Sequence, residues 1–408
     1  MATSGVRVNK RIQLALFTVP ISVHDASTYS GCVTRIFAVK VPFLALAANV
    51  QNWEGPHIDV SADNRAIDWW YTQVISQTPA SGKVSDRALT GIPPSIEIVL
   101  KHGNTFQFGA SNTPLYPVEI NGFDQDGLPF KQTIIFNRSS VVSAKGVTTG
   151  TWGNKEIVFT ASRNPHKKFT IELNTPAATG TVVVESESHF LTGCGGTKVT
   201  DSPYFDKLVA NGRPLTDAEV ILYKKTGWRV SIPAGPSSVD LVISGKPVKF
   251  KGAGYKDSNW GPNAMNDFVR SWYVLIAQVG PWSFVTFSGT PSTGTNYINS
   301  AHLSYRGKFV TSQCNIIGER TTDISIITPS GEVTESNVVA PTAFDVTFVL
   351  PNSKKVSFHA TNIAANPSVG VYHRWVAKYT GGAPGEHYEA YGITEWMNAG
   401  NVSHWPAF

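Results

Sequence analysis

The chain has 408 residues, of which 41% are hydrophobic and only 15% charged, with 35 Gly and 25 Pro. This composition excludes an intrinsically disordered chain and indicates an ordered globular protein with many turns between short elements. The formal net charge of +5 is small for this length and no long Lys/Arg run occurs, so the charge balance gives no argument for a nucleic-acid partner.

The amino-terminal part has one distinct pattern. Lys10 and Arg11 precede an apolar run and small residues follow near Ala26, so that residues 10–26 loosely resemble a secretory signal; the rest of residues 1–60 has no assigned pattern. The apolar run near residue 45 is too short to span a bilayer, and we expect a soluble protein without stable membrane insertion. Localisation stays open between the cytoplasm and a secretory route with N-glycosylation at Asn137 and Asn401.

The predicted elements are mainly short β-rich runs separated by Gly, Pro, Asn and Asp, which is typical of antiparallel sandwiches or barrels. Only the stretches near Leu215 and Asn263 have the composition of a helix, and the second is equally compatible with a loop. We therefore predict an all-β fold with two antiparallel β domains. The predicted strands begin at Ile67, Ile96, Lys131, Glu156, Lys167, Gly180, Val239, Ser283, Lys308, Thr322, Phe344 and Lys354.

A length of 408 residues is long for one core, and the domain boundary is expected at a turn-rich stretch. The run from Pro233 to Ser238 has the composition of a short linker. It divides the chain into an amino-terminal β domain, residues 1–235, and a carboxy-terminal β domain, residues 236–408.

The strand predicted from Ile67 carries indoles on both faces. Because side chains alternate along a strand, Trp69, Tyr71 and Gln73 share one face, and Trp70 lies on the other. Both faces then need cover, which favours a core on one side and a cavity or second domain on the other. This pattern predicts a site at the domain interface.

A second aromatic stretch runs from Gly252 to Phe287 and mixes three indoles with a few hydrogen-bonding groups. Within it, Lys256 and Asp257 can be interpreted in two ways. At a strand end they fall on opposite faces, which leaves one charge directed inward, and in a surface turn they form a local ion pair. The closing stretch from Gly385 again places acids beside aromatics, and an ordinary last strand explains it equally well. Together these stretches predict a pocket with flat apolar walls.

Signatures of metal and covalent chemistry do not appear. We found no nucleophile elbow, HExxH, Walker or Rossmann pattern, and the ten His lack metal-ligand spacing. Cys32, Cys194 and Cys314 cannot all pair with one another, and a bond between Cys32 and Cys194 stays open. We therefore expect neither a metal nor a cofactor. A ligand-binding protein and an enzyme that works by shaping its substrate both remain.

Three motifs in combination resemble the fungal Diels-Alderase family, the pericyclases of polyketide and terpenoid pathways, which are distantly related to bacterial carotenoid hydratases. DWWY with a following Ser, at Asp68 to Tyr71 and Ser76, resembles the family's DWWYFDxxS. GAGYKDSNWG followed by SWY and VGPWSFV resembles GxGYHDxNWG with WYW and GPYSxV, and GEHYEAYGITEW is similar to GExYxGxGxxE. The chain departs from these patterns at Thr72, Gln73, Lys256 and Trp282, where the family usually has Phe, Asp, His and Tyr.

The resemblance implies two lipocalin-like or sandwich β domains with a pocket between them, and a stereoselective [4+2] cycloaddition of a hydrophobic small molecule without a cofactor. The substrate is either a polyene that closes on itself or a quinone methide that joins a terpene. By the matching positions, polar catalytic contacts are expected from Tyr255, Lys256, Asp257, Asn259 and Gln73, and substrate walls and contacts from Trp69, Tyr71, Trp260, Trp272, Tyr273, Gln278, Trp375 and Tyr391. A lipocalin-like carrier of a hydrophobic metabolite and a hydratase are the alternatives.

Overall fold

The structure is a computed structural model, and it describes residues 54–60, 65–80, 91–105, 116–162, 167–192, 214–294, 298–316, 326–335, 338–350, 352–369 and 372–398. All of them belong to one compact unit that runs from Leu44 to Phe408. The predictions for the signal-like segment at residues 10–26, for Cys32 and Cys194, and for glycosylation of Asn401 lie outside the described residues.

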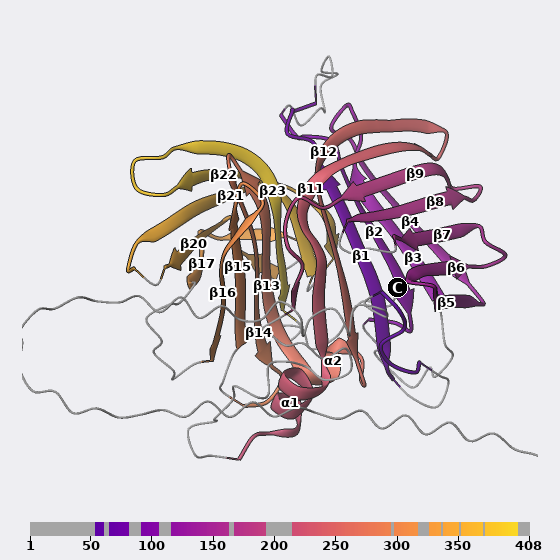
Figure 1. Ribbon diagram of the computed structural model, residues 1–408, viewed down its shortest axis with the longest axis horizontal. Coiled ribbons are helices and arrows are strands. Elements are labelled where there is room, and N and C mark those ends of the chain that lie inside the picture. Colours follow the sequence, from indigo (N-terminus) through magenta and orange to yellow (C-terminus); the bar gives the residue numbers. More distant parts are fainter. Residues whose placement is uncertain are drawn as a thin grey trace, which may run out of the picture. The chain divides into compact units, whose positions relative to one another are not determined.

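The first antiparallel sheet has the order β4-β3-β2-β1-β12-β11-β9-β8-β7-β6-β5, with β10 paired to β11 (Figure 1). Neighbours along the chain are mostly neighbours in the sheet, as expected for hairpin connections. Its strands are β1 (Ile67–Ile75), β2 (Ser95–His102), β3 (Tyr116–Phe123), β4 (Pro129–Phe136), β5 (Ser139–Ala144), β6 (Val147–Trp152), β7 (Ile157–Ala161), β8 (Lys168–Asn174), β9 (Ala178–Glu185), β10 (Leu191–Thr192), β11 (Gly227–Ile243) and β12 (Lys246–Gly261).

A second antiparallel sheet follows in the order β16-β15-β14-β13-β23-β22-β21-β20-β17, and β18 and β19 form a separate hairpin. The predicted all-β fold with two antiparallel sheets is thereby confirmed. Its strands are β13 (Val269–Val279), β14 (Trp282–Pro291), β15 (Ile298–Tyr305), β16 (Lys308–Ile316), β17 (Ile326–Ser330), β18 (Val333–Glu335), β19 (Val338–Ala340), β20 (Ala343–Val349), β21 (Lys355–Val369), β22 (Tyr372–Gly382) and β23 (Tyr388–Asn398).

Both stretches with helical composition form short helices. α1 (Asp217–Val220) begins at the N-cap Thr216, whose hydroxyl accepts from the amide of Glu219 while the Glu219 carboxylate accepts from the Thr216 amide. This capping box satisfies two amides that the first turn leaves unpaired. α1 runs into the single π-helical turn η5 (Ile221–Lys225), and α2 (Met265–Phe268) leads directly into β13.

The stretch that we predicted as a linker, Pro233 to Ser238, lies inside β11, so that prediction is wrong. Two register shifts, between Val230 and Ile232 and between Ile232 and Gly235, accommodate it. Proline cannot donate to a sheet ladder and is tolerated at such bulges, which explains how a turn-like composition persists within a strand. The change from the first sheet to the second occurs between β12 and β13, through α2. The division into two domains stays a prediction.

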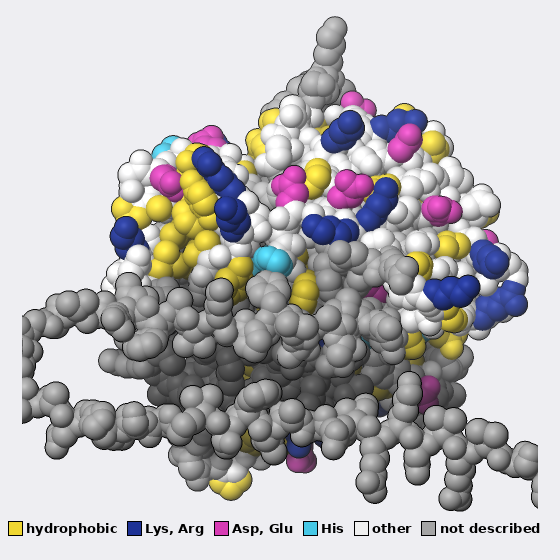
Figure 2. Space-filling view, viewed as in Figure 1, with side chains coloured by type: hydrophobic (Ala, Val, Ile, Leu, Met, Phe, Trp, Pro, Cys, Tyr) yellow, Lys and Arg dark blue, Asp and Glu magenta, His cyan; other side chains and the backbone are white. Residues whose placement is uncertain are grey.

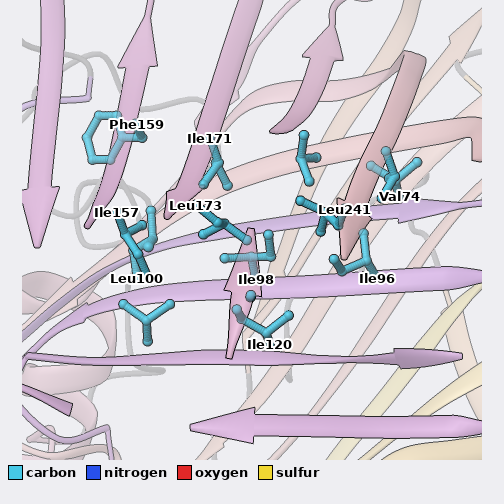
Figure 3. Close-up of a cluster of buried hydrophobic side chains, with 14 of the residues drawn as sticks. Val74, Ile96, Ile98, Leu100, Ile120, Ile157, Phe159, Ile171, Leu173 and Leu241 are labelled. Carbon is cyan, nitrogen blue, oxygen red and sulfur yellow. The ribbon is translucent and has the colours of Figure 1, made fainter. Parts of the chain in front are cut away.

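The main core of the first sheet is aliphatic. Figure 3 shows Val74, Ile96 and Ile98 among the side chains of this cluster, which β1 and β2 share with β7, β8 and β11. Trp70 belongs to the same cluster, whereas Trp69 and Tyr71 belong to a second cluster that includes residues of β13 and β23. The predicted alternation of β1 is therefore confirmed, and its second face is directed toward residues of the second sheet.

The visible surface carries charges of both signs. On the face shown in Figure 2, Lys and Arg side chains lie among Asp and Glu over the described residues. None of the helices within the described ranges has the length and apolar character needed to cross a membrane.

Candidate functional site

The antiparallel pairing of β1 with β12 brings the predicted polar residues together. Tyr71 lies opposite Asp257, and Gln73 lies opposite Tyr255. Directly paired residues of an antiparallel sheet point to the same face, so these four side chains share the face that turns toward the second sheet. Two motifs separated by about 180 positions along the chain thus form one surface.

A small pocket lies between the two sheets at this surface. Its enclosed volume is only about 10 Å³. Gln73 and Tyr255 line it from the first sheet, and Gln278 and Tyr391 from the second, with Ile75, Pro233, Ala253, Gly254, Ile276, Ala277 and Gly392 between them. Pockets for drug-sized ligands usually enclose about 300 to 1,000 Å³, so a substrate of that size requires the pocket to widen.

Asp257 is the centre of the first buried polar network behind the pocket. Its carboxylate accepts hydrogen bonds from the Tyr255 hydroxyl at 2.6 Å, Trp228 Nε1 at 2.9 Å and Asn259 Nδ2 at 2.8 Å. Burial raises the pKa of Asp257 to about 6, although these hydrogen bonds and Lys256 oppose the rise. The Tyr255 ring therefore lines the pocket while its hydroxyl is held by an acid that titrates near neutral pH.

Tyr71 is the centre of the second network, which joins the sheets. Its hydroxyl oxygen lies 2.8 Å from Gln73 Oε1 and 2.8 Å from Glu395 Oε1, and it accepts a hydrogen bond from Arg374 Nε at 3.1 Å. Burial, followed by the charge of Glu395, raises the pKa of Tyr71 well above its ordinary value. Tyr71 therefore stays protonated, and can donate a hydrogen bond, throughout the physiological pH range.

The charges around Tyr71 are deeply buried. Burial, with a contribution from Glu97, raises the pKa of Glu395 to about 8 against the opposing effect of Arg374. Burial also raises the pKa of Glu97, which accepts from Asn121 Nδ2 at 2.8 Å and lies 3.9 Å from Arg374. For Arg374, burial lowers the pKa, but Tyr71 and the nearby acids more than offset it, so the guanidinium stays charged.

This arrangement places a proton-donating group and a proton-accepting group next to one pocket. At pH 7 a carboxyl with a pKa of about 8 is mainly protonated, whereas one with a pKa of about 6 is mainly ionised. Pairs of titratable groups whose environments separate their pKa values in this way are suited to acid and base roles. Glu395 is the candidate acid and Asp257 the candidate base. Asp257 is one hydrogen bond away from the pocket-lining Tyr255, and Glu395 is two away, through Tyr71 to Gln73.

The second sheet adds an amide donor. Nε2 of Gln278, a pocket-lining residue, is buried and has no hydrogen-bond partner among the residues that the structure describes. An unpaired buried donor costs about 1 to 3 kcal/mol, and an acceptor on a bound ligand would recover it. Gln278 is thus well placed to hold a carbonyl oxygen.

Aromatic side chains form the apolar surroundings of the two networks. Trp69 and Trp272, which we predicted as substrate walls, belong to one buried cluster together with Tyr71 and Tyr255. Trp228, with its indole ring centroid 5.5 Å from that of Phe287, and Tyr372, 6.2 Å from Trp272, extend this cluster. Flat rigid walls of this kind restrict the shapes that a bound molecule can adopt.

Four predicted site residues lie on other faces of their strands. Of the other nine, Gln73, Tyr255, Gln278 and Tyr391 line the pocket, and Trp69, Tyr71, Asp257, Asn259 and Trp272 belong to the networks and the aromatic cluster beside it. Lys256 and Trp260 point to the opposite face of β12, where Lys256 pairs with Glu54 and Trp260 stacks on His57 with centroids 4.1 Å apart. Tyr273 and Trp375 belong to the internal cluster of the second sheet. The period of two along β12, β13 and β22 causes this separation, because neighbouring residues of one motif point in opposite directions.

Sequence reasoning missed several members of the site. Glu395 stands in the closing motif, but nothing in its local pattern indicates that it contacts Tyr71. Glu97 and Arg374 are single charges within apolar strand sequences, SIEIVL and YHRWVA, and this was the only signal that they gave. A charge in a strand that is buried on both faces requires a partner, so both residues were candidates for a buried network.

Comparison with known proteins extends the sequence resemblance. The family described as Diels-Alderase-like matches residues 107–399, which is more than half of the chain. The chain is 24% identical to the quinolone epoxide rearrangement protein penF of Penicillium thymicola over 343 residues, 82% of this chain and 84% of that protein. It is also 24% identical to the Diels-Alderase pyiF of Pyricularia grisea over 197 residues, 46% of this chain and 43% of that protein.

Solved structures show the same fold. The crystal structure of CghA with Sch210972 aligns with a TM-score of 0.62 and 17% identity, over 82% of this chain and 88% of that one. Kievitone hydratase from Nectria haematococca aligns with a TM-score of 0.50 and 11% identity, over 88% of this chain and 94% of that one. At these identities the likeness concerns the fold alone. The match over residues 107–399 confirms the resemblance seen in the motifs, and the chain belongs to the Diels-Alderase-like family.

Proposed function

We propose that this protein is a cofactor-independent pericyclase that catalyses a stereoselective [4+2] cycloaddition of a hydrophobic natural-product precursor. The observation that carries the proposal is the pocket between the sheets. Apolar residues make up most of its lining, and Gln73 from the first sheet and Gln278 from the second also line it. A cycloaddition forms its bonds without a nucleophile, so orientation and a few hydrogen bonds supply the catalysis.

Orientation is expected to be the larger contribution. Holding a diene and a dienophile in one reactive geometry recovers about 7 to 11 kcal/mol in the best intramolecular systems. The apolar residues of the pocket, together with Trp69 and Trp272 once the pocket widens toward their cluster, would select one folded shape of the substrate and thereby one stereoisomer. Because the pocket is small, we expect the side chains that line it to move apart when the substrate binds.

Hydrogen bonding is the second contribution. A donor to the carbonyl of the dienophile lowers the energy of its acceptor orbital, and one well-placed donor supplies about 2.7 to 4 kcal/mol in enzymes that stabilise an oxyanion. Gln278 Nε2 is the candidate for direct contact. Glu395 and Tyr71 would act through Gln73, whose Oε1 already contacts the Tyr71 hydroxyl.

Two substrate classes fit this proposal. One is a flexible polyene attached to a tetramic acid, which closes on itself to give a decalin. The other is a quinone methide that joins the olefin of a terpene in a hetero-Diels-Alder reaction. Both combine a long apolar part with a carbonyl group, which fits a mainly apolar lining that includes Gln278.

A second candidate function is the acid-promoted rearrangement of an epoxide. The buried carboxyl of Glu395, with its pKa raised to about 8, favours it. A protonated acid at neutral pH can supply a proton, through the Tyr71 hydroxyl that it contacts, to an epoxide oxygen as the C–O bond breaks, once the pocket has widened to Tyr71. The product then returns a proton to the carboxylate. The similarity to penF, named for quinolone epoxide rearrangement, supports the same reaction class.

Incubation of the purified protein with three separate precursors tests these assignments. They are a polyene tetramic acid, a hydroxylated quinone-methide precursor with a terpene olefin, and a quinolone epoxide, each compared with buffer and with heat-denatured protein. A faster reaction with a changed isomer ratio for either of the first two supports the cycloaddition. Conversion of the epoxide alone supports the second candidate. Binding of a precursor with an unchanged rate and isomer ratio would indicate a carrier, and a product heavier by one water would indicate a hydratase.

A further inference from the structure

The segment at residues 54–60 lies against the back of the two strands that carry the candidate site. The backbone oxygen of Glu54 accepts a hydrogen bond from Trp70 Nε1 at 2.9 Å, which ties the segment to β1. His57 adds two bonds to the carboxylate of Asp68, from its amide at 2.8 Å and through Nδ1 at 2.9 Å. The segment is therefore attached to β1 at both Asp68 and Trp70.

A buried polar network attaches the same segment to β12. Lys256 Nζ donates to the Glu54 carboxylate and, at 2.7 Å, to Ser258 Oγ. Ser258 Oγ donates in turn to Glu54 Oε2 at 3.1 Å. The side chains of Lys256 and Glu54 are fully buried, and the ammonium lies 4.9 Å from the centroid of the Phe169 ring.

A buried ion pair is a weak device for stability alone. Both charges lose their hydration on folding, and well-packed apolar residues of similar size often stabilise a fold equally well. Burial accordingly lowers the pKa of Lys256 well below its ordinary value, although Asp257 opposes the shift. What a hydrogen-bonded pair provides, and an apolar contact does not, is one fixed geometry between the groups that it joins.

The location of the Glu54–Lys256 pair matters for the site because Lys256 stands between Tyr255 and Asp257 in the sequence of β12. Side chains alternate along β12, so a bond that fixes Lys256 on one face also fixes the backbone from which Tyr255 and Asp257 project on the other. Lys256 lies opposite Thr72, between the pairs Tyr71 with Asp257 and Gln73 with Tyr255. The network thus lies directly behind the two polar networks of the pocket.

We propose that the Glu54–Lys256–Ser258 network is a positioning element that holds β12 so that Asp257 keeps its hydrogen bonds to Tyr255 and Trp228. Lys256 is then a positioning residue and not a catalytic one. The proposal deepens the proposed function, because that function gives the Asp257 face its role, but the geometry of Asp257 can be measured without any substrate.

The indole of Trp228 is a reporter of this geometry, since its Nε1 donates to Asp257 Oδ2. The test labels the full chain with 5-fluorotryptophan and follows the ¹⁹F resonance of Trp228, assigned by its absence in Trp228→Phe, together with thermal unfolding. The variants are Lys256→Met, Glu54→Gln, and the double variant Lys256→Met with Glu54→Leu. The control is Lys101→Met with Glu119→Leu, which removes another cross-strand pair of the first sheet, with 2.6 Å between its charged atoms.

We expect Lys256→Met to lower the Tm and to shift or broaden the Trp228 resonance, because it leaves Glu54 buried without its cation. Glu54→Gln should shift the resonance less. The double variant should recover the Tm while the resonance remains shifted, and the control should leave the resonance at its wild-type position.

A wild-type resonance in the double variant would overturn the proposal and reduce the network to a stabilising contact. An unchanged resonance in Lys256→Met and Glu54→Gln would overturn it as well. If Lys256→Met does not fold, the double variant and Glu54→Gln still decide. Because no substrate is present, none of these results depends on which reaction the protein catalyses.

Discussion

The Tyr71 hydroxyl oxygen lies 2.8 Å from Oε1 of Glu395, a residue 324 positions further along the chain and in the other sheet. The phenol has a single proton but lies equally close to Gln73 Oε1. Tyr71 can satisfy one of these oxygens, and a protonated Glu395 satisfies the other contact by donating its own proton. The raised pKa of Glu395, about 8, agrees with a carboxyl that is protonated at neutral pH. The contact therefore links the two sheets and holds one proton that can exchange.

Tyr71→Phe should weaken the protein and slow the reaction. Removal of the hydroxyl leaves Arg374 Nε and the buried oxygens of Gln73 and Glu395 with one partner fewer, which we expect to reduce the free energy of unfolding by about 1 to 3 kcal/mol. Urea unfolding measures this loss, and turnover of the accepted precursor should also fall. The matched control is Tyr273→Phe. Tyr273 packs against the internal cluster of the second sheet, on the face of β13 that points away from Tyr71. Equal effects of the two substitutions on turnover would contradict the placement of the site.

The stability should depend on pH through Glu395. Its pKa is about 8 in the folded protein and near 4.5 when the chain is unfolded, so the folded state binds more protons between these values. The stabilising contribution is complete below pH 4.5 and is lost as the pH rises through 8. Glu395→Gln removes this titration, so the unfolding free energy of wild type minus that of the variant should fall steadily as the pH rises over that range. A difference that is constant from pH 5 to pH 9 would show that Glu395 is ionised in the folded state.

Two tryptophans should differ in their effect on the product. Trp272 belongs to the cluster with Tyr71 and Tyr255, whereas Trp375 belongs to the internal cluster of the second sheet. Trp272→Phe should change the ratio of product isomers, because it removes part of a substrate wall. Trp375→Phe should lower the free energy of unfolding by about 1 to 3 kcal/mol and leave the isomer ratio unchanged. Chiral chromatography of the product checks both statements, and an altered ratio with Trp375→Phe alone would place the wall in the other cluster.

The strands could be predicted from the sequence because they depend on local patterns. Alternation along Ile67–Ile75 correctly separated Trp69 and Tyr71 from Trp70, and the composition after Thr216 correctly indicated a helix. The stretch from Pro233 to Ser238 was misread as a linker because its Pro and Gly residues are also those of a bulged strand. Local composition does not distinguish the two, since the difference lies in the pairing of β11 with β12.

The site could be predicted only in part, because membership depends on which face a residue occupies after folding. The motifs named Tyr255, Asp257 and Asn259, which the structure joins in one hydrogen-bonded network, but also Lys256 and Trp260, which the period of two directs to the other face. Glu54, the partner of Lys256, lies in a segment to which no pattern was assigned. Glu395 and Arg374 join the site through long-range contacts with Tyr71, and no local signal gives such contacts.

The central claim is that ring formation occurs at the pocket between the sheets, with the Gln278 amide as the donor to the substrate carbonyl. The most direct measurement compares the turnover and isomer ratio of wild type, Gln278→Leu and Gln132→Leu on the precursor that the wild type converts. Gln132 lies in β4 and donates a hydrogen bond to Ser244 Oγ at 2.9 Å, outside the pocket, and serves as the matched control. We predict a loss of about 100-fold or more for Gln278→Leu, the usual contribution of one positioned hydrogen-bond donor, and wild-type turnover for Gln132→Leu. Wild-type turnover and isomer ratio in Gln278→Leu would contradict the claim.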